Sequence, residues 1–124
     1  MNVHSKIFRI QSNDDFKRVA LEVFRFQFEN LKVYREYISL LNISPESVDE
    51  IEKIPFLPIS FFKTQKIVCE NKLPEITFLS SGTSGAETSR HHVTNVQLYE
   101  QSFLKGFKLF YGNTSEYCIL ALLP

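Results

Sequence analysis

The prediction of the fold starts from one stretch, Ile76-Thr77-Phe78-Leu79-Ser80-Ser81-Gly82-Thr83-Ser84-Gly85, in which a strand-forming run leads directly into hydroxyl residues and glycines. Ile76–Leu79 combines β-branched and aromatic residues, which favour a strand. In Ser80–Gly85 the glycines let the backbone approach an anion, and N–H groups and hydroxyls are donors for phosphate oxygens. The spacing fits neither a Walker loop nor a dinucleotide fingerprint. On composition alone, a Ser/Gly-rich surface turn is an equally good interpretation.

The residues after this loop predict a crossover unit of an α/β fold. His91–Val93 is expected to be extended, and Thr94 to cap a helix that ends at Gly112. Glu116–Leu123 is almost continuously apolar, as in a buried central strand. The order strand, loop, helix, strand predicts one βαβ crossover, the first part of a larger sheet. Such a sheet needs further neighbours, so we expect residues 1–124 to be the N-terminal fragment of a longer protein.

The residues before the loop predict a helical segment and an extended approach. Apolar residues recur at three- and four-residue steps over residues 16–41, after a capping box that starts at Ser12. This pattern is longer than a usual globular helix, so we expect a break within it. A Ser-Pro start signal predicts a short helix near 45–52, and the prolines of 54–59 exclude helix there. The chain then divides into a helical segment (1–53), a prolyl approach (54–75) and the strand, loop, helix, strand unit (76–124).

The composition argues against several classes of protein. The 124 residues are 44% hydrophobic, which is globular, and 14 basic residues balance 14 acidic ones. Net charge therefore gives no reason to expect nucleic acid as a partner. Apolar runs fall far short of the roughly 18–20 residues that span a bilayer, and no signal peptide is recognisable. Cys69 and Cys118 form no disulfide framework, so we expect a cytoplasmic protein in which both cysteines pack in the core.

The loop and its flanks also resemble a known family. Residues 78–85 resemble the phosphate-binding loop of the adenylate-forming superfamily, whose pattern is Ser/Thr-Ser/Thr-Gly-Thr-Thr/Ser-Gly. The segments 54–63, 89–91 and 98–104 resemble the acyl-protein synthetase (LuxE-type) branch of that superfamily. The resemblance covers residues 45–124. Phenylacetate-CoA ligases have a similar loop and a similar prolyl approach, so an aryl- or acyl-CoA ligase is the alternative.

The resemblance implies an activity for the whole protein. The enzyme would join a long-chain fatty acid to the α-phosphate of ATP, release pyrophosphate and pass the acyl group to a thiol. ATP and Mg²⁺ are then the expected cofactors, and a fatty-acid reductase or another acyl-acceptor protein is the expected partner. The fold would be the incomplete N-terminal domain of an adenylate-forming enzyme. We expect residues 1–124 alone to be inactive, because the adenine-binding, carboxylate-binding and acyl-accepting parts, including the acceptor cysteine, would lie elsewhere.

The resemblance also assigns candidate site residues. Those that would hold the β- and γ-phosphates of ATP are Ser80, Ser81, Gly82, Thr83, Ser84 and Gly85. Many superfamily members place Pro-Lys after the second glycine, whereas Ala86–Ser89 stands there in this chain and the first cation is Arg90. Arg90 is therefore the candidate cation for phosphate, and the alternative is an exposed arginine paired with Glu87. No catalytic residue and no metal ligand is assigned.

The remaining candidates favour structural roles. His91 and His92 are adjacent, so on an extended segment they face opposite sides, and a structural role is expected for each. The acidic residues expected to form a solvated surface are Glu46, Asp49, Glu50 and Glu52. A third hypothesis is a non-catalytic α/β interaction domain whose Ser/Gly loop is only a turn. An exposed apolar sheet face also predicts that the isolated chain associates with itself.

Overall fold

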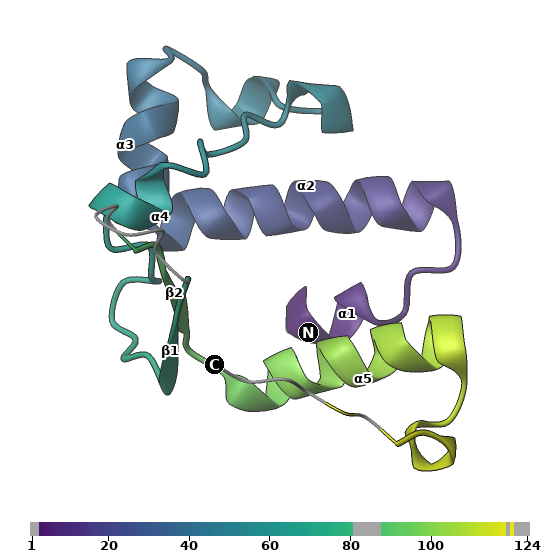
Figure 1. The fold of residues 1–124 in the computed structure, drawn as a ribbon. Helices are drawn as coiled ribbons and strands as arrows, with labels where there is room; N and C mark the ends of the chain where they lie inside the picture. The colour runs from purple at the N-terminus through teal and green to yellow at the C-terminus, as the bar shows by residue number, and fades with distance from the viewer. Residues whose placement is uncertain (1–2, 81–87, 119, 121–124) are drawn as a thin grey trace. The chain divides into compact units, whose positions relative to one another are not determined.

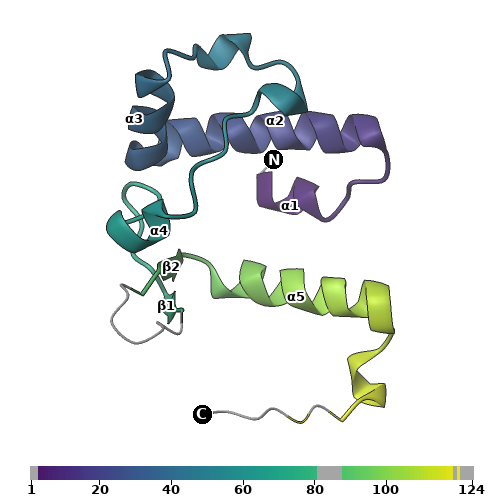
Figure 2. The ribbon, with the colours of Figure 1, turned by 45° about the horizontal axis from the view of Figure 1, so that its top comes forward.

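A computed structural model describes residues 3–80, 88–118 and 120. The contacts divide the chain into two units, Met1–Thr94 and Asn95–Pro124, which we describe separately. Figures 1 and 2 show the elements from two directions. Those of the first unit are α1 (Val3–Ile7), α2 (Asn13–Asn30), α3 (Lys32–Leu40), the 3-10 turns η1 (Pro45–Ser47) and η2 (Ile51–Lys53), α4 (Phe61–Thr64), β1 (Ile76–Leu79) and β2 (Arg90–Val93). The second unit contains α5 (Val96–Tyr111) and the 3-10 turn η3 (Thr114–Glu116).

Helix α2 begins where the sequence predicts a cap. The hydroxyl oxygen of Ser12 accepts a hydrogen bond of 3.1 Å from the backbone N–H of Asp15, which confirms this half of the capping box. The predicted break in the helical pattern is also present, because the backbone of Leu31 is extended (φ −111°, ψ 107°) and separates α2 from α3. Both views show α3 turning away from the axis of α2 (Figures 1 and 2).

The core of the first unit lies mainly where α2 and α3 face each other. Its most deeply buried side chains are Ile38, 0% exposed, and Val48, 1% exposed. The ring of Phe24 meets the ring of Tyr34 edge to face, with centroids 6.1 Å apart. The predicted stripe therefore supplies much of the core, although its two ends are exposed. The buried cluster consists of Leu21, Phe24, Leu31, Tyr34, Ile38, Val48 and Ile67.

The segment that leads to the hairpin is irregular. Instead of the short helix predicted near 45–52, two 3-10 turns form, because the backbone of Glu50 is extended (φ −124°, ψ 152°) and interrupts the helix. Residues 54–59 contain no helix, as their prolines predict. The phenol of Tyr34 donates a hydrogen bond of 2.7 Å to the carbonyl oxygen of Pro55. This bond fastens the prolyl approach to α3.

The sheet differs from the predicted βαβ crossover. Strand β1 is present at the predicted residues, and the extended segment 91–93 is confirmed as part of β2. The two strands pair with each other as an antiparallel hairpin, with Phe78 opposite His91 and Leu79 opposite Arg90. The reason is proximity along the chain, since strands joined by a loop pair locally at a lower entropic cost than strands joined through a helix. The described part of the chain thus combines helices with a small antiparallel sheet.

The second unit confirms the predicted helix but not the strand after it. Helix α5 is capped by Asn95, not by the predicted Thr94, because the side chain of Asn95 accepts from the N–H of Leu98 at 2.8 Å. It ends at Gly112, whose positive φ of 86° suits glycine. Residues 117, 118 and 120 belong to no strand and are exposed, so the prediction of a buried strand is wrong for them. Residues 119 and 121–123 of the same predicted strand lie outside the described residues.

Candidate functional site

The candidate phosphate loop is described only at its two ends. Ser80 follows β1 directly and is exposed. Ser81, Gly82, Thr83, Ser84 and Gly85 lie outside the described residues, as does Glu87, the alternative partner of Arg90. The description resumes at Thr88 and Ser89, directly before β2. The hairpin therefore fixes where the loop leaves one strand and where it enters the next.

Ser80 and Ser89 form the closing pair of this hairpin. The backbone N–H of Ser80 donates to the carbonyl oxygen of Ser89 at 3.1 Å. The hydroxyl oxygen of Ser80 accepts from the backbone N–H of Ser89 at 3.0 Å and from the hydroxyl of Ser89 at 2.9 Å. Ser89 is not among the site residues predicted from the sequence, because no spacing in the sequence marks it as the partner of Ser80.

Arg90 is exposed at the same end of the hairpin, but on the other face. It is the first residue of β2 and lies opposite Leu79. Because side chains alternate along a strand, Leu79 and Arg90 share one face while Ser80 and Ser89 share the opposite face. Arg90 has no ion-pair partner within residues 3–80, 88–118 and 120. The hydroxyls of Ser80 and Ser89 lie at the same end of the hairpin, on its other face.

The two histidines face opposite sides, as predicted. His91 stacks on the ring of Phe62 in α4, with ring centroids 5.8 Å apart and an interplanar angle of 23°. The Nδ1 atom of His92 lies 2.9 Å from the hydroxyl oxygen of Thr77 on β1. One imidazole thus packs the hairpin against the prolyl approach and the other joins its two strands. Both contacts are structural, which agrees with the role predicted for each.

Comparison with known proteins decides the family. Residues 7–122 match the family described as acyl-protein synthetase, LuxE. The chain belongs to this acyl-protein synthetase family. A long-chain-fatty-acid–luciferin-component ligase of Photorhabdus luminescens is 32% identical over 73 residues. The match covers 58% of this chain and 62% of that relative, so it spans less than two thirds of the relative's length. No solved structure matches the chain.

The two cysteines of the chain differ in their surroundings. Cys69 is half-buried and packs against the core, as predicted, whereas Cys118 is exposed, which contradicts its predicted place in a buried strand. Burial raises the pKa of the Cys69 thiol above its usual value, and the nearby charge of Lys72 opposes that effect in part. The half-buried thiol is therefore a poor nucleophile, because the thiolate is the reactive form.

The acidic residues near η1 and η2 form an exposed surface, as predicted. Glu46, Asp49, Glu50 and Glu52 are all exposed. Two of them pair with lysines, Asp49 with Lys53 and Glu50 with Lys17, each at 2.6 Å. In the described ranges, no three His, Cys, Asp or Glu side chains form a group that could hold a metal ion. None of the helices there has the length and apolar character needed to cross a membrane.

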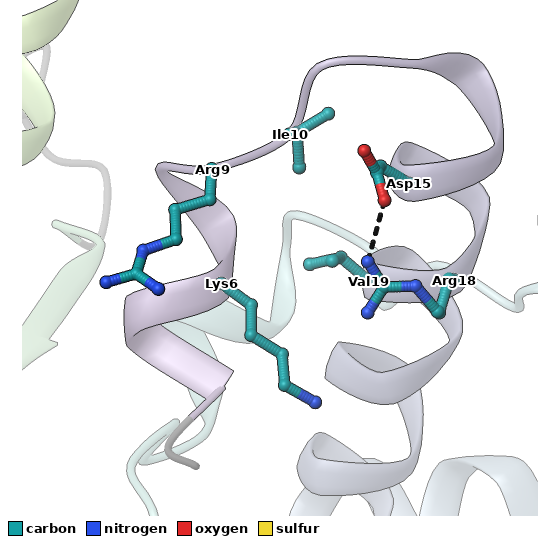
Figure 3. A pocket seen from close by; sticks show the side chains of 6 residues that line it. All are labelled: Lys6, Arg9, Ile10, Asp15, Arg18 and Val19. Carbon is teal, nitrogen blue, oxygen red and sulfur yellow. Dashed lines mark hydrogen bonds and ion pairs between the residues drawn. The ribbon is translucent and has the colours of Figure 1, made fainter.

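A small hollow lies between α1 and the start of α2 (Figure 3). It has a volume of about 140 Å³ and contains three basic side chains, which raises the question of an anion site. Arg18 pairs with Asp15 at 2.7 Å, and Lys6 pairs with Glu22 at 2.6 Å. Figure 3 shows Arg9 pointing away from α2, so the positive groups do not converge. We assign no ligand to this hollow, whose lining consists of Lys6, Arg9, Ile10, Asp15, Arg18 and Val19.

Proposed function

We propose that this chain is part of an ATP-dependent ligase that activates a long-chain fatty acid and passes the acyl group to a protein thiol. Membership of the acyl-protein synthetase family supports this proposal, and so does the relative named as a long-chain-fatty-acid–luciferin-component ligase. The single observation that carries it is the sequence Ser80–Gly85, placed between the two strands of a hairpin whose ends are fixed by Ser80 and Ser89.

The proposed reaction has two steps. A carboxylate oxygen of the fatty acid attacks the α-phosphorus of ATP, and the bond from that phosphorus to the oxygen bridging the α- and β-phosphates breaks, which releases pyrophosphate. A thiol then attacks the acyl carbon and AMP leaves, while the thiol proton passes to a base or to solvent. An enzyme contributes to such a step mainly by positioning and by stabilising negative charge. Cytoplasmic location is proposed with this activity.

The loop residues would hold the β- and γ-phosphates while pyrophosphate leaves. The exposed Ser80 hydroxyl fits this task, since it accepts two hydrogen bonds from Ser89 and its own proton is left to donate. Arg90 adds a positive charge at the same end of the hairpin. Mg²⁺, when bound with ATP, would neutralise part of the phosphate charge. We assign it no protein ligand among the described residues.

Pyrophosphate exchange tests the activity directly. The protein that carries residues 1–124 at its natural length should incorporate labelled pyrophosphate into ATP only when a long-chain fatty acid is present. Thr83→Ala should reduce this exchange, and Ser47→Ala is a matched control, because Ser47 is an exposed serine on η1 whose hydroxyl donates to the Ser44 carbonyl. Absence of exchange with every fatty acid, or exchange unchanged by Thr83→Ala, would contradict the proposal.

The same preparation distinguishes the alternatives. An acyl-protein synthetase transfers the labelled acyl group to a protein, whereas an aryl- or acyl-CoA ligase releases a free thioester when coenzyme A is added. A non-catalytic interaction domain would show neither product and no heat on titration with ATP and magnesium. The family match favours the first outcome.

A further inference from the structure

The closing pair of the hairpin departs from a regular antiparallel ladder. In a regular hydrogen-bonded pair, each residue's N–H donates to the carbonyl oxygen of the residue opposite. Ser80 donates to the Ser89 carbonyl in this way, at 3.1 Å. The return bond from the N–H of Ser89 goes instead to the Ser80 hydroxyl oxygen, at 3.0 Å. A side chain therefore takes the place of a backbone carbonyl where the loop begins.

The second hydroxyl strengthens this arrangement. With the bond between the hydroxyls assigned as Ser89 donating to Ser80, the Ser80 oxygen accepts two hydrogen bonds, at 3.0 and 2.9 Å. A hydroxyl has two acceptor lone pairs and one donor proton, so both lone pairs of Ser80 are engaged. Replacing either serine with alanine removes at least one bond, and Ser80→Ala also removes the acceptor of a backbone N–H. The pair thus depends on side chains that most hairpins do not need.

We propose that Ser80 and Ser89 form a positioning pair for ATP, in which Ser89 acts through Ser80 and not by contact with nucleotide. This inference rests on the proposed function. Both acceptor positions of the Ser80 hydroxyl are taken by Ser89, so the remaining Ser80 proton is held in one direction as a donor for a phosphate oxygen. A donor that is already oriented binds its ligand at a lower entropic cost, so affinity for the ligand rises. The direction of this donor is then set by Ser89, a residue that lies outside the six-residue motif.

The pair is tested by kinetics of the natural-length protein. Pyrophosphate exchange is measured at varied ATP with saturating fatty acid, and then at varied fatty acid with saturating ATP. Ser89→Ala should raise the KM for ATP by between about threefold and tenfold, which is the change in affinity expected when one hydrogen bond is lost. The KM for fatty acid should stay unchanged. Ser89→Thr keeps the hydroxyl and should return the KM for ATP to within about twofold of the wild-type value.

Two further variants separate positioning from general damage. Thr77→Ala is the matched control, because it removes a hydroxyl contact of 2.9 Å between the same strands, to His92, but on the opposite face from the serines. It should leave the KM for ATP unchanged. The double variant Ser80→Ala/Ser89→Ala should be no worse than Ser80→Ala alone, since one interaction cannot be lost twice.

The outcomes distinguish this inference from the proposed function. Calorimetric affinity for ATP with magnesium is measured for each variant, so the pair is tested even in a protein that shows no exchange. A wild-type protein that binds ATP without fatty-acid-dependent exchange contradicts the function only. If the wild type shows exchange and Ser89→Ala changes neither the KM for ATP nor the affinity for ATP, the pair alone is overturned. Equal effects of Ser89→Ala and Thr77→Ala, or additive serine effects, also overturn it, and a wild type that binds no ATP overturns both.

Discussion

The imidazole of His91 lies stacked on the phenyl ring of Phe62, with centroids 5.8 Å apart. Phe62 belongs to the short helix α4 at the end of the prolyl approach, and His91 belongs to β2. The hairpin that carries both ends of the Ser/Gly loop is thereby packed against the segment that precedes it. Together with the bond from Tyr34 to Pro55, this contact connects the helical core to the candidate site through the prolyl approach.

Removing the ring of Phe62 should destabilise the protein. Phe62 is half-buried, so Phe62→Ala should cost about 2 kcal/mol of unfolding free energy, roughly half the loss expected for a fully buried phenylalanine. Denaturant unfolding measures this loss. Phe56→Ala is the matched control from the same approach, because Phe56 is 77% exposed and its loss should change stability by less than about 0.5 kcal/mol. Equal effects of the two variants would show that the stacked pair contributes nothing.

The phenol of Tyr34 should stabilise the fold in its protonated form. Burial raises the pKa of Tyr34 from the ordinary value of 10.0 to about 12, and the neutral phenol donates to Pro55. A pKa raised in the folded state contributes stability that is fully present below pH 10. That contribution is lost as pH rises from about 10 through about 12. Tyr34→Phe should cost about 1 kcal/mol at neutral pH.

Two measurements check the Tyr34 prediction. Ultraviolet titration of phenolate should show one late-titrating tyrosine in the folded protein that disappears in Tyr34→Phe. Unfolding free energies between pH 9 and pH 12 should fall less steeply for the variant than for the wild type. Should the late titration persist in Tyr34→Phe, the assignment of that pKa to Tyr34 is wrong.

The sequence predicted the local elements better than their pairing. The strand at 76–79 and the end of α5 at Gly112 each follow from neighbouring residues, so a local pattern was sufficient. A break in the first helical pattern was predicted from its length, but its position at Leu31 was not. The antiparallel pairing of β1 with β2 was not predicted, because period and propensity do not state which strand pairs with which. The apolar run 116–123 was expected to be buried because of its composition, but composition does not state what would cover it, and residues 117, 118 and 120 are exposed.

Some of the contacts around the candidate site could be predicted from the sequence. The resemblance of the loop located Ser80, but not its partner Ser89, since a hydroxyl that replaces a backbone acceptor leaves no spacing signal. The opposite facing of His91 and His92 followed from the two-residue period of a strand. The contact between His91 and Phe62 joins residues 29 positions apart, which periodicity does not report. The roles of Ser81–Gly85 and Arg90 in holding phosphate, and the self-association of the isolated chain, stay predictions.

Truncating the most buried core residue should be the most damaging single change in α3. Ile38 is 0% exposed, and Ile38→Ala should cost between about 2 and 5 kcal/mol, while Ile38→Val should cost between about 0.5 and 1.5 kcal/mol. Leu40→Ala lies two residues further along the same helix and is the control, since Leu40 is 82% exposed. Thermal and denaturant unfolding of the three variants measure the difference. A loss in Leu40→Ala as large as that in Ile38→Ala would refute the packing described here.

Neither cysteine of this chain should accept the acyl group. Burial raises the pKa of Cys69, which lowers its thiolate fraction at neutral pH, and Cys118 is exposed without a described feature that would activate it. Cys69→Ser and Cys118→Ser should therefore retain both fatty-acid-dependent pyrophosphate exchange and transfer of labelled acyl group to protein, within about twofold of wild type. Thiol alkylation followed by mass spectrometry should also label Cys118 before Cys69 in the folded protein, because only the thiolate reacts. Loss of acyl transfer with exchange retained in Cys118→Ser would identify that cysteine as the acceptor and reverse this assignment.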